Sequence, residues 1–308
     1  MNHEYCIACK KDRLKVLKKY SQAHLVQCNS CGLVFSQKIP SNQELKDYYK
    51  VYAYNDNVYS DITKQRYLEL LQTFEKYRKT NKILDVGCGN GFFLEIAKKQ
   101  GWEVYGTEFS EKAIEILNKK GINSKTGSLK VNNYAEGMFD IITSFEVLEH
   151  IYNPIEELNK FNYLLRNNGL LYATTPNFNS LSRKLLNEKW NIITYPEHLT
   201  YYSCKSINKI LVNSSFLKLH VKTTGFSISR LQISINQKSK KNIAKDNDLQ
   251  KKSKDELIRY KMNKKGLFNL IIKAINYFLN IFKLGDTIKI YYIKHNFNYN
   301  EKNFNNRR

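Results

Sequence analysis

The chain has 308 residues, 42% of them hydrophobic, which allows one sizeable α/β domain and a small accessory module. No apolar run follows the first charged residues and no apolar stretch reaches transmembrane length, so we expect a cytoplasmic protein. The formal net charge of +22 suits an anionic partner, although lysines spread over solvated faces account for it equally well.

The N-terminal segment contains four of the six cysteines, arranged as two Cys-x-x-Cys pairs. Each pair places two thiolates on one tight turn, and two such turns supply the tetrahedral ligand set that zinc requires. Disulfides are the alternative, but a chain without an export signal meets reducing conditions, which favour metal. We predict a zinc ribbon over residues 1–39, with a structural ion because four thiolates leave no open coordination position. The predicted ligands are Cys6, Cys9, Cys28 and Cys31.

Residues 40–80 are expected to connect this ribbon to the main domain. They begin with a tyrosine-rich linker and continue with a segment in which apolar residues recur at helical spacing. These residues are Tyr67, Leu70, Leu71, Phe74 and Tyr77. We predict an amphipathic helix that leads into the main domain.

Strands and helices alternate from residue 81 onward, which predicts an α/β domain over residues 81–295 with a parallel sheet covered on both faces. The expected strands are residues 82–86, 102–108, 139–144, 170–175, 217–223 and 285–294. The expected helices are residues 91–101, 110–121 and 154–169.

The alternation is interrupted before the last strand. Residues 238–265 are rich in lysine, and residues 266–283 have polar residues at every third or fourth position, which predicts a helix with a wide apolar face. Residues 226–285 therefore form a helical insertion, and residues 296–308 are expected to be a disordered tail. The apolar face either packs on the sheet or on a second subunit, or it makes peripheral contact with a membrane through residues 238–283.

A strand runs into a glycine turn and then a helix at residues 83–91, Ile-Leu-Asp-Val-Gly-Cys-Gly-Asn-Gly. Glycines here let the backbone bend sharply and come close to a ligand across the strand end. The spacing differs from the Gly-x-Gly-x-x-Gly turn that receives a pyrophosphate. An acid before the glycines suits instead a ligand with an ammonium group, such as the methionine part of S-adenosylmethionine. The predicted contacts are Asp85, Gly87, Gly89 and Gly91.

A second acid, Glu108, closes the next strand, where a carboxylate can accept hydrogen bonds from both hydroxyls of a ribose. A carboxylate at a strand end can also simply cap the following helix, and Ser110 could serve as that cap. The combination of Asp85 and Glu108 favours a nucleoside ligand with an ammonium group.

With these motifs the sequence resembles the class I S-adenosylmethionine-dependent methyltransferases, in particular the methyltransferase type 11, 12 and 23 group. This group shares a Glu-x-x-Glu-His element, here residues 146–150, with the ubiquinone-pathway O-methyltransferases. The resemblance covers about residues 80–225 and implies a Rossmann-like, seven-stranded α/β methyltransferase sheet behind the small zinc ribbon, with S-adenosylmethionine as cofactor. By the same resemblance, further cofactor contacts are Phe109, Gly127, Ser128, Leu129 and Glu146.

His150 follows the fourth strand, and an imidazole with a pKa near neutrality suits removal of a proton from the acceptor during methyl transfer. Glu149 is placed to orient that ring. By resemblance to the ubiquinone enzymes, Glu146, Glu149 and His150 could instead bind a divalent ion such as magnesium, and a purely structural role is a third reading. His198 is a second candidate base, because in this family its stretch closes over the substrate from the opposite side. Trp190 in the same loop is interpreted as a lid contact.

The residues after the fourth strand indicate which class of acceptor molecule the protein methylates. Enzymes that methylate exocyclic base amines carry Asn or Asp, two prolines and an aromatic there, whereas this chain has Ser-Phe-Glu-Val-Leu-Glu-His, which argues against a nucleic-acid partner. An N-terminal ribbon also occurs, by resemblance, in deoxysugar C-methyltransferases and in guanine methyltransferases of ribosomal RNA. We expect O- or C-methylation of a small-molecule or sugar and glycan acceptor. An RNA methyltransferase anchored by the ribbon and basic surface, and a scaffold that only binds cofactor, are the alternatives.

Overall fold

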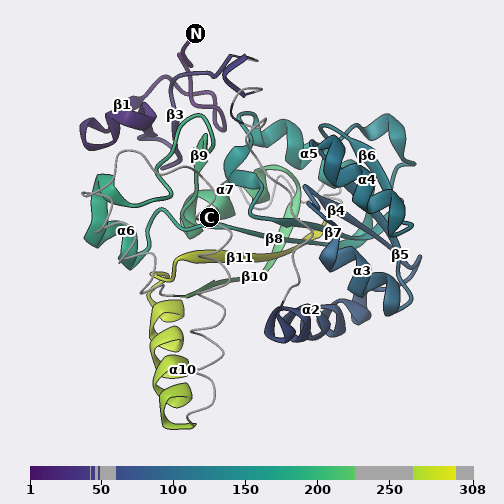
Figure 1. Ribbon diagram of the computed structural model, residues 1–308. Helices are drawn as coiled ribbons and strands as arrows, with labels where there is room; N and C mark the ends of the chain where they lie inside the picture. The colour runs from purple at the N-terminus through teal and green to yellow at the C-terminus, as the bar shows by residue number, and fades with distance from the viewer. Residues whose placement is uncertain (42, 46–47, 49–59, 226–265, 296–308) are drawn as a thin grey trace, which may run out of the picture.

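The computed structural model of the protein describes residues 1–41, 43–45, 48, 60–225 and 266–295 (Figure 1). Within the last of these ranges, side chains are described from residue 274 onward. The predicted tail and the lysine-rich segment before the last helix lie outside the described residues.

The main domain is built on the predicted seven-stranded sheet. Its strands, in spatial order, are β10 (Phe216–Thr224), β11 (Thr287–Lys294), β8 (Leu165–Pro176), β7 (Phe139–Phe145), β4 (Lys82–Val86), β5 (Glu103–Glu108) and β6 (Asn123–Thr126). Strands β6, β5, β4, β7 and β8 are parallel, and β11 runs antiparallel to both of its neighbours. The strand order reverses between β4 and β7, and in such sheets ligands bind beyond the carboxyl ends at this point.

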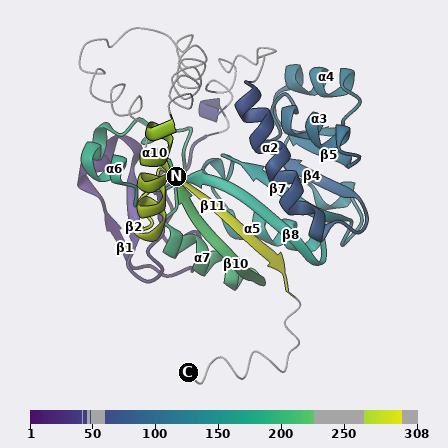
Figure 2. The same cartoon turned by 90° about the horizontal axis from the view of Figure 1, so that it is seen from below.

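Helices cover both faces of the sheet, as the sequence predicted (Figures 1 and 2). Successive strand residues point to opposite faces, so Ile83 and Leu84 enter different apolar clusters. Ile83 packs with α2 (Asp61–Phe74), α3 (Phe92–Lys99) and α4 (Glu111–Lys119), and Leu84 with α5 (Pro154–Leu164) and α7 (Cys204–Asn213). The predicted fold class, an α/β domain with a Rossmann-like seven-stranded sheet, is therefore confirmed.

Two local expectations were wrong. The helix predicted over residues 154–169 ends at Leu164, because Leu165 adopts extended φ/ψ angles (−72°, 137°) and begins β8. Strand β6 was not predicted, because its sequence Asn-Ser-Lys-Thr is polar and lies at the sheet edge, where no apolar alternation is required. Its pairing with β5 alone holds it in the sheet.

The N-terminal segment folds as a small antiparallel sheet of β1 (Leu14–Val16), β2 (Leu25–Cys28) and β3 (Val34–Ser36). A fourth strand, β9 (Thr200–Tyr201), comes from the main domain and pairs with β3. This pairing joins segments that are far apart in the chain and was not predicted from the sequence.

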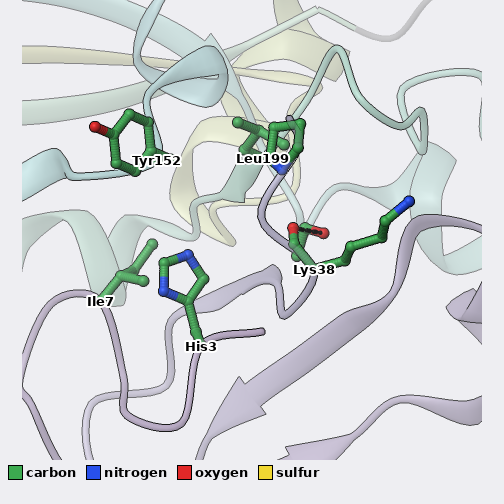
Figure 3. Close-up of a pocket in the computed structure, with 7 residues that line it drawn as sticks. His3, Ile7, Lys38, Tyr152 and Leu199 are labelled. Carbon is green, nitrogen blue, oxygen red and sulfur yellow. Dashed lines mark hydrogen bonds between the residues drawn. The ribbon is translucent and has the colours of Figure 1, made fainter. Parts of the chain in front are cut away.

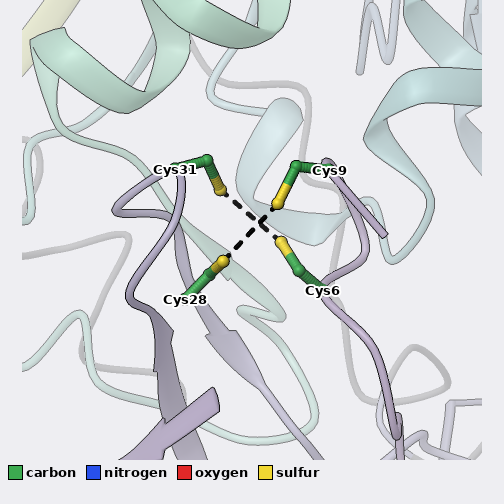
Figure 4. A group of neighbouring side chains, drawn as sticks. All are labelled: Cys6, Cys9, Cys28 and Cys31. Atoms are coloured by element: carbon green, nitrogen blue, oxygen red, sulfur yellow. Dashed lines mark hydrogen bonds between the residues drawn. The ribbon is translucent and has the colours of Figure 1, made fainter. Parts of the chain in front are cut away.

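The four predicted cysteines converge at one end of this sheet (Figure 4). The sulfur atoms of Cys6 and Cys31, and those of Cys9 and Cys28, are 3.5 Å apart, and all four sulfurs lie within 4.8 Å of one another. The cysteines are free thiols, since a disulfide bond is only about 2.05 Å long. The hydrogen bond from Cys31 lowers the pKa of Cys6 to about 5, so one thiolate is available at neutral pH.

The last helix, α10 (Gly266–Ile281), lies between β10 and β11 in the chain, as predicted. It runs away from the sheet and extends beyond its neighbours (Figure 1). Within the described residues, no helix is long and apolar enough to cross a membrane.

Candidate functional site

The glycine turn after β4 has the backbone conformation that its sequence requires. Gly87, Gly89 and Gly91 have φ angles of 73°, 53° and 70°, in the left-handed region that favours glycine. A Cβ atom on Gly87 would come within 2.5 Å of Val147, and one on Gly91 within 2.3 Å of Leu117. The glycines therefore permit both the sharp turn and its close packing against neighbouring segments.

The two predicted acids face this turn from adjacent strands. Asp85 is buried at the end of β4 and accepts a 2.8 Å hydrogen bond from the Thr143 hydroxyl. Burial raises the pKa of Asp85 to about 8, against the lowering effect of Thr143, and the charge of Glu108 adds to the rise. A carboxyl group in this state favours a cationic ligand, which would restore its charge.

Glu108 ties the turn to the end of β5. One carboxylate oxygen accepts from the backbone N–H of Gly89 at 3.0 Å, and the other accepts from Phe109 at 2.7 Å and from Ser110 at 3.1 Å. Ser110 caps α4 by accepting from Ala113. Glu108 is buried with its carboxylate at the glycine turn, so it lies where a ligand crossing the strand ends would meet it.

The other predicted cofactor residues lie in different environments. Phe109 is exposed and Ser128 is exposed, whereas Leu129 is buried in the main apolar cluster. Gly127 donates its backbone N–H to the Glu108 carbonyl, which keeps this segment beside β5. Glu146 is exposed after β7, with a left-handed φ of 54°.

The two candidate bases, which are distant in sequence, meet beyond the end of β7. The ring centroids of His150 and His198 are 4.8 Å apart. Nδ1 of His150 lies 2.7 Å from the carbonyl oxygen of Glu197, and Nδ1 of His198 lies 2.7 Å from that of Ile192. Because a carbonyl only accepts, each Nδ1 donates, and in the neutral rings Nε2 carries the lone pair. Both histidines are thus held in the tautomer that can take a proton at Nε2.

Glu149 has a different role from the one that the sequence suggested. It is buried and accepts a 2.9 Å hydrogen bond from Thr175, and the Glu197 carbonyl holds Nδ1 of His150 in its place. Burial, reinforced by the charge of Glu146, raises the pKa of Glu149 well above its usual range. The surroundings of Glu149 therefore favour the neutral form of its carboxyl group.

The residues here do not fit the predicted magnesium site. The ligand atoms that lie within 4.8 Å of one another belong to Glu149, His150 and His198, and Glu146 is not among them. Magnesium prefers an octahedral set of oxygen ligands, whereas two of these three ligands are imidazole nitrogens. We therefore assign no chemical step to magnesium.

A shallow hollow, with no room for a water molecule, lies between the N-terminal segment and the main domain. It is lined by His3, Ile7 and Lys38 from the N-terminal segment and by Tyr152 and Leu199 from the main domain (Figure 3). Tyr152 and Leu199 closely follow the two histidines in sequence. The hollow shows that ribbon residues reach the vicinity of the candidate bases.

Several residues around the site were missed or misplaced by the sequence reasoning. Thr143 donates a hydrogen bond to Asp85, and Thr175 donates one to Glu149. Both threonines are polar residues inside an otherwise apolar strand, and this pattern could have identified them. Tyr67, on the predicted lead-in helix, packs against Phe145 at the end of β7. Trp190, interpreted as a lid contact, is instead buried in a cluster with residues of the N-terminal sheet.

Comparisons with known proteins agree with this architecture. A family model described as a methyltransferase domain matches residues 59–221, which is more than half of the chain. An S-adenosylmethionine-dependent methyltransferase of Archaeoglobus fulgidus has the same fold, with a TM-score of 0.51 and 18% identity over 76% of this chain and 94% of its own.

Curated relatives include two proteins named ubiquinone biosynthesis O-methyltransferase. The protein from Bordetella avium is 30% identical over 37% of this chain and 51% of its own length, and that from Thiobacillus denitrificans is 32% identical over 33% and 47%. The chain thus spans about half the length of the curated relatives that it matches. Given the matched domain and the fold, the chain belongs to the methyltransferase domain family.

Proposed function

We propose that the protein methylates a hydroxyl group or an acidic carbon of a small-molecule or sugar acceptor, with His150 and His198 as the proton-accepting groups. The observation that carries this proposal is the pair of rings whose Nδ1 atoms both donate to backbone carbonyls. The names of the curated relatives favour an oxygen acceptor. The proposal also includes sugar or glycan acceptors, and methylation at carbon as well as at oxygen.

In this proposal the cofactor lies at the glycine turn between β4 and α3, beside the end of β5. Asp85 would meet the ammonium group of its methionine part and Glu108 its ribose, with the backbone of Gly87, Gly89 and Gly91 close to the ligand. When bound, the cofactor supplies a methyl group on a positively charged sulfur, and the sulfur keeps the bonding electrons as the methyl group leaves. By resemblance, Phe109, Ser128, Leu129 and Glu146 complete the contacts.

The protein's part in the reaction is to position the acceptor and remove its proton. As the acceptor atom attacks the methyl carbon, Nε2 of a histidine takes the proton from that atom and the ring becomes a cation. The Glu197 and Ile192 carbonyls accept from Nδ1 and stabilise this cation.

Transfer of a labelled methyl group tests the acceptor class. We expect label in a phenolic or nucleotide-sugar fraction when the protein is incubated with labelled S-adenosylmethionine. Label in total RNA instead would support the RNA alternative, and label in no fraction, with cofactor binding intact, would support the scaffold.

Replacing Glu108 should weaken cofactor binding. Loss of a charged hydrogen-bond acceptor for the ribose is expected to cost about 1.5–3 kcal/mol, which corresponds to roughly a 10- to 150-fold higher Kd. Calorimetry on Glu108→Ala measures it. Glu115→Ala on the exposed side of α4 removes the same charge and should leave the Kd unchanged. Equal affinities for wild type and Glu108→Ala would refute the ribose assignment.

The affinity for the cofactor should rise with pH through the titration of Asp85. Its pKa of about 8 in the free protein means that it is mainly protonated at pH 7. An ammonium group nearby favours the carboxylate, so binding releases a proton and becomes tighter as the pH rises toward 8. Calorimetry at pH 7 in buffers of different ionisation enthalpy should detect this release. It should be absent from Asp85→Asn, and its persistence there would assign the proton to another group.

Replacing either histidine should slow catalysis without loss of cofactor. His150→Ala and His198→Ala are expected to lower kcat by about 100- to 10,000-fold, because general-base catalysis contributes that much. The Kd for S-adenosylmethionine should not change. His220→Ala, on β10 against Tyr291, is the matched control and should retain activity. Full activity in both site variants would remove the histidines from the mechanism.

We also propose a structural zinc ion on Cys6, Cys9, Cys28 and Cys31. A tetrahedral zinc site with bonds of about 2.3 Å has sulfur atoms about 3.8 Å apart, close to the 3.5 Å of the two thiol pairs. The purified protein should contain one zinc per chain by metal analysis. Cys9→Ser should lose the ion and reduce the free energy of unfolding by more than about 3 kcal/mol.

Because the N-terminal sheet holds β9, Cys9→Ser should also lower kcat while the Kd for the cofactor stays the same. Cys204→Ser, outside the cluster, is the control for loss of a thiol. A zinc-free wild-type protein with unchanged stability and activity would contradict the proposal.

A further inference from the structure

The polar side of α10 faces the protein. Asn280 accepts from the backbone N–H of Thr223 at 2.9 Å, Asn276 accepts from that of Gly225 at 3.1 Å, and Lys283 donates to the Val221 carbonyl at 2.9 Å. These groups satisfy the free edge of β10, the outermost strand of the sheet. The polar stripe of the helix is therefore used for attachment and does not face solvent.

The apolar side of α10 faces outward. Of the large apolar residues described in and just after this helix, Leu279 is buried, whereas the others are between 46% and 65% exposed. The exposed residues are Ile275, Tyr277, Phe278, Ile281 and Phe282. A helix that packs on its own domain presents the opposite arrangement. These five residues form the apolar face of α10, which no described part of the chain covers.

The charge of the residues in and just before α10 indicates what kind of partner covers the apolar face of α10. Residues 257–273 contain five Lys or Arg residues and no Asp or Glu. A second copy of the chain would bring like charges together, and the whole chain carries +22. An anionic lipid surface satisfies both the cations and the apolar side chains. The helix has 16 residues, fewer than the ~20 needed to span a bilayer, so it would lie in the interface.

The segment that follows α10 is hydrogen-bonded to the residue that follows β8. The side-chain amide of Asn177, which follows β8, donates to the carbonyls of Lys283 and Gly285 at 3.0 and 2.8 Å. Contact through α10 would therefore act on a segment joined to the carboxyl end of β8.

We propose that the apolar face of α10 binds the protein to the surface of an anionic membrane. This inference goes beyond the proposed function, because it concerns where the enzyme is held and not what it methylates. It predicts reversible, salt-sensitive binding that needs both anionic lipid and the exposed aromatic side chains.

Vesicle flotation of the full chain tests the proposal. Wild-type protein should float with phosphatidylglycerol-containing vesicles at low salt, less at high salt, and not with phosphatidylcholine alone. Phe278→Ser with Phe282→Ser should lower the partition coefficient by at least about 10-fold, because two large apolar groups no longer enter the interface. Phe278→Leu with Phe282→Leu should restore most of the binding.

The matched control removes exposed apolar groups elsewhere. Val16→Ser with Tyr163→Ser should float like wild type, since these residues lie on β1 and α5. Cofactor Kd, measured for every variant, reports whether the main domain is folded. Absence of wild-type flotation, or equal flotation of the serine variant, overturns the proposal. Wild-type dimers that the serine variant converts to monomers, without vesicle binding, would assign the face to a second copy.

Discussion

The pairing of β3 with β9 is the constraint on which the arrangement of the site depends. Phe35 pairs with Thr200, and the N–H of Ser36 donates to the Leu199 carbonyl at 2.8 Å. The Thr200 hydroxyl then donates to the carbonyl of Ile151, the residue after His150. One short ladder therefore connects the N-terminal sheet to the segments of both candidate bases. A change in that sheet therefore reaches the segments of the histidines through hydrogen bonds.

Apolar packing reinforces this connection. Trp190, Ile193 and Tyr201 from the segment around His198 are buried together with Tyr20 and Leu25 of the N-terminal part. Burial of a large aromatic side chain stabilises a fold by several kcal/mol, whereas a two-residue ladder contributes little alone. The cysteine cluster holds the other end of the same sheet. The N-terminal sheet thus packs against the segment that carries His198, an arrangement that its separate position in the sequence did not indicate.

The sequence was sufficient to predict the parts of the molecule that are determined locally. The strand, glycine turn and acid of residues 82–91 and the acid of β5 follow from spacing alone, because backbone conformation and strand direction fix where they lie. The β3–β9 ladder and the tautomers of the histidines could not be predicted, because they arise from contacts between distant segments. The outward apolar face of α10 was likewise undecided, since periodicity defines two faces but not which one meets the protein.

The residues proposed to contact the cofactor and those proposed to contact the acceptor lie in different parts of the chain, which affects how specificity for the acceptor can change. The proposed contacts of Asp85 and Glu108 with the cofactor lie at the ends of two neighbouring strands, β4 and β5, so they can stay constant while other parts of the chain change. The proposed acceptor side combines residues after β7, the loop before β9 and the N-terminal sheet, and none of the hydrogen bonds given for Asp85 or Glu108 comes from these segments. Differences among relatives in this second group can change the acceptor without loss of cofactor binding.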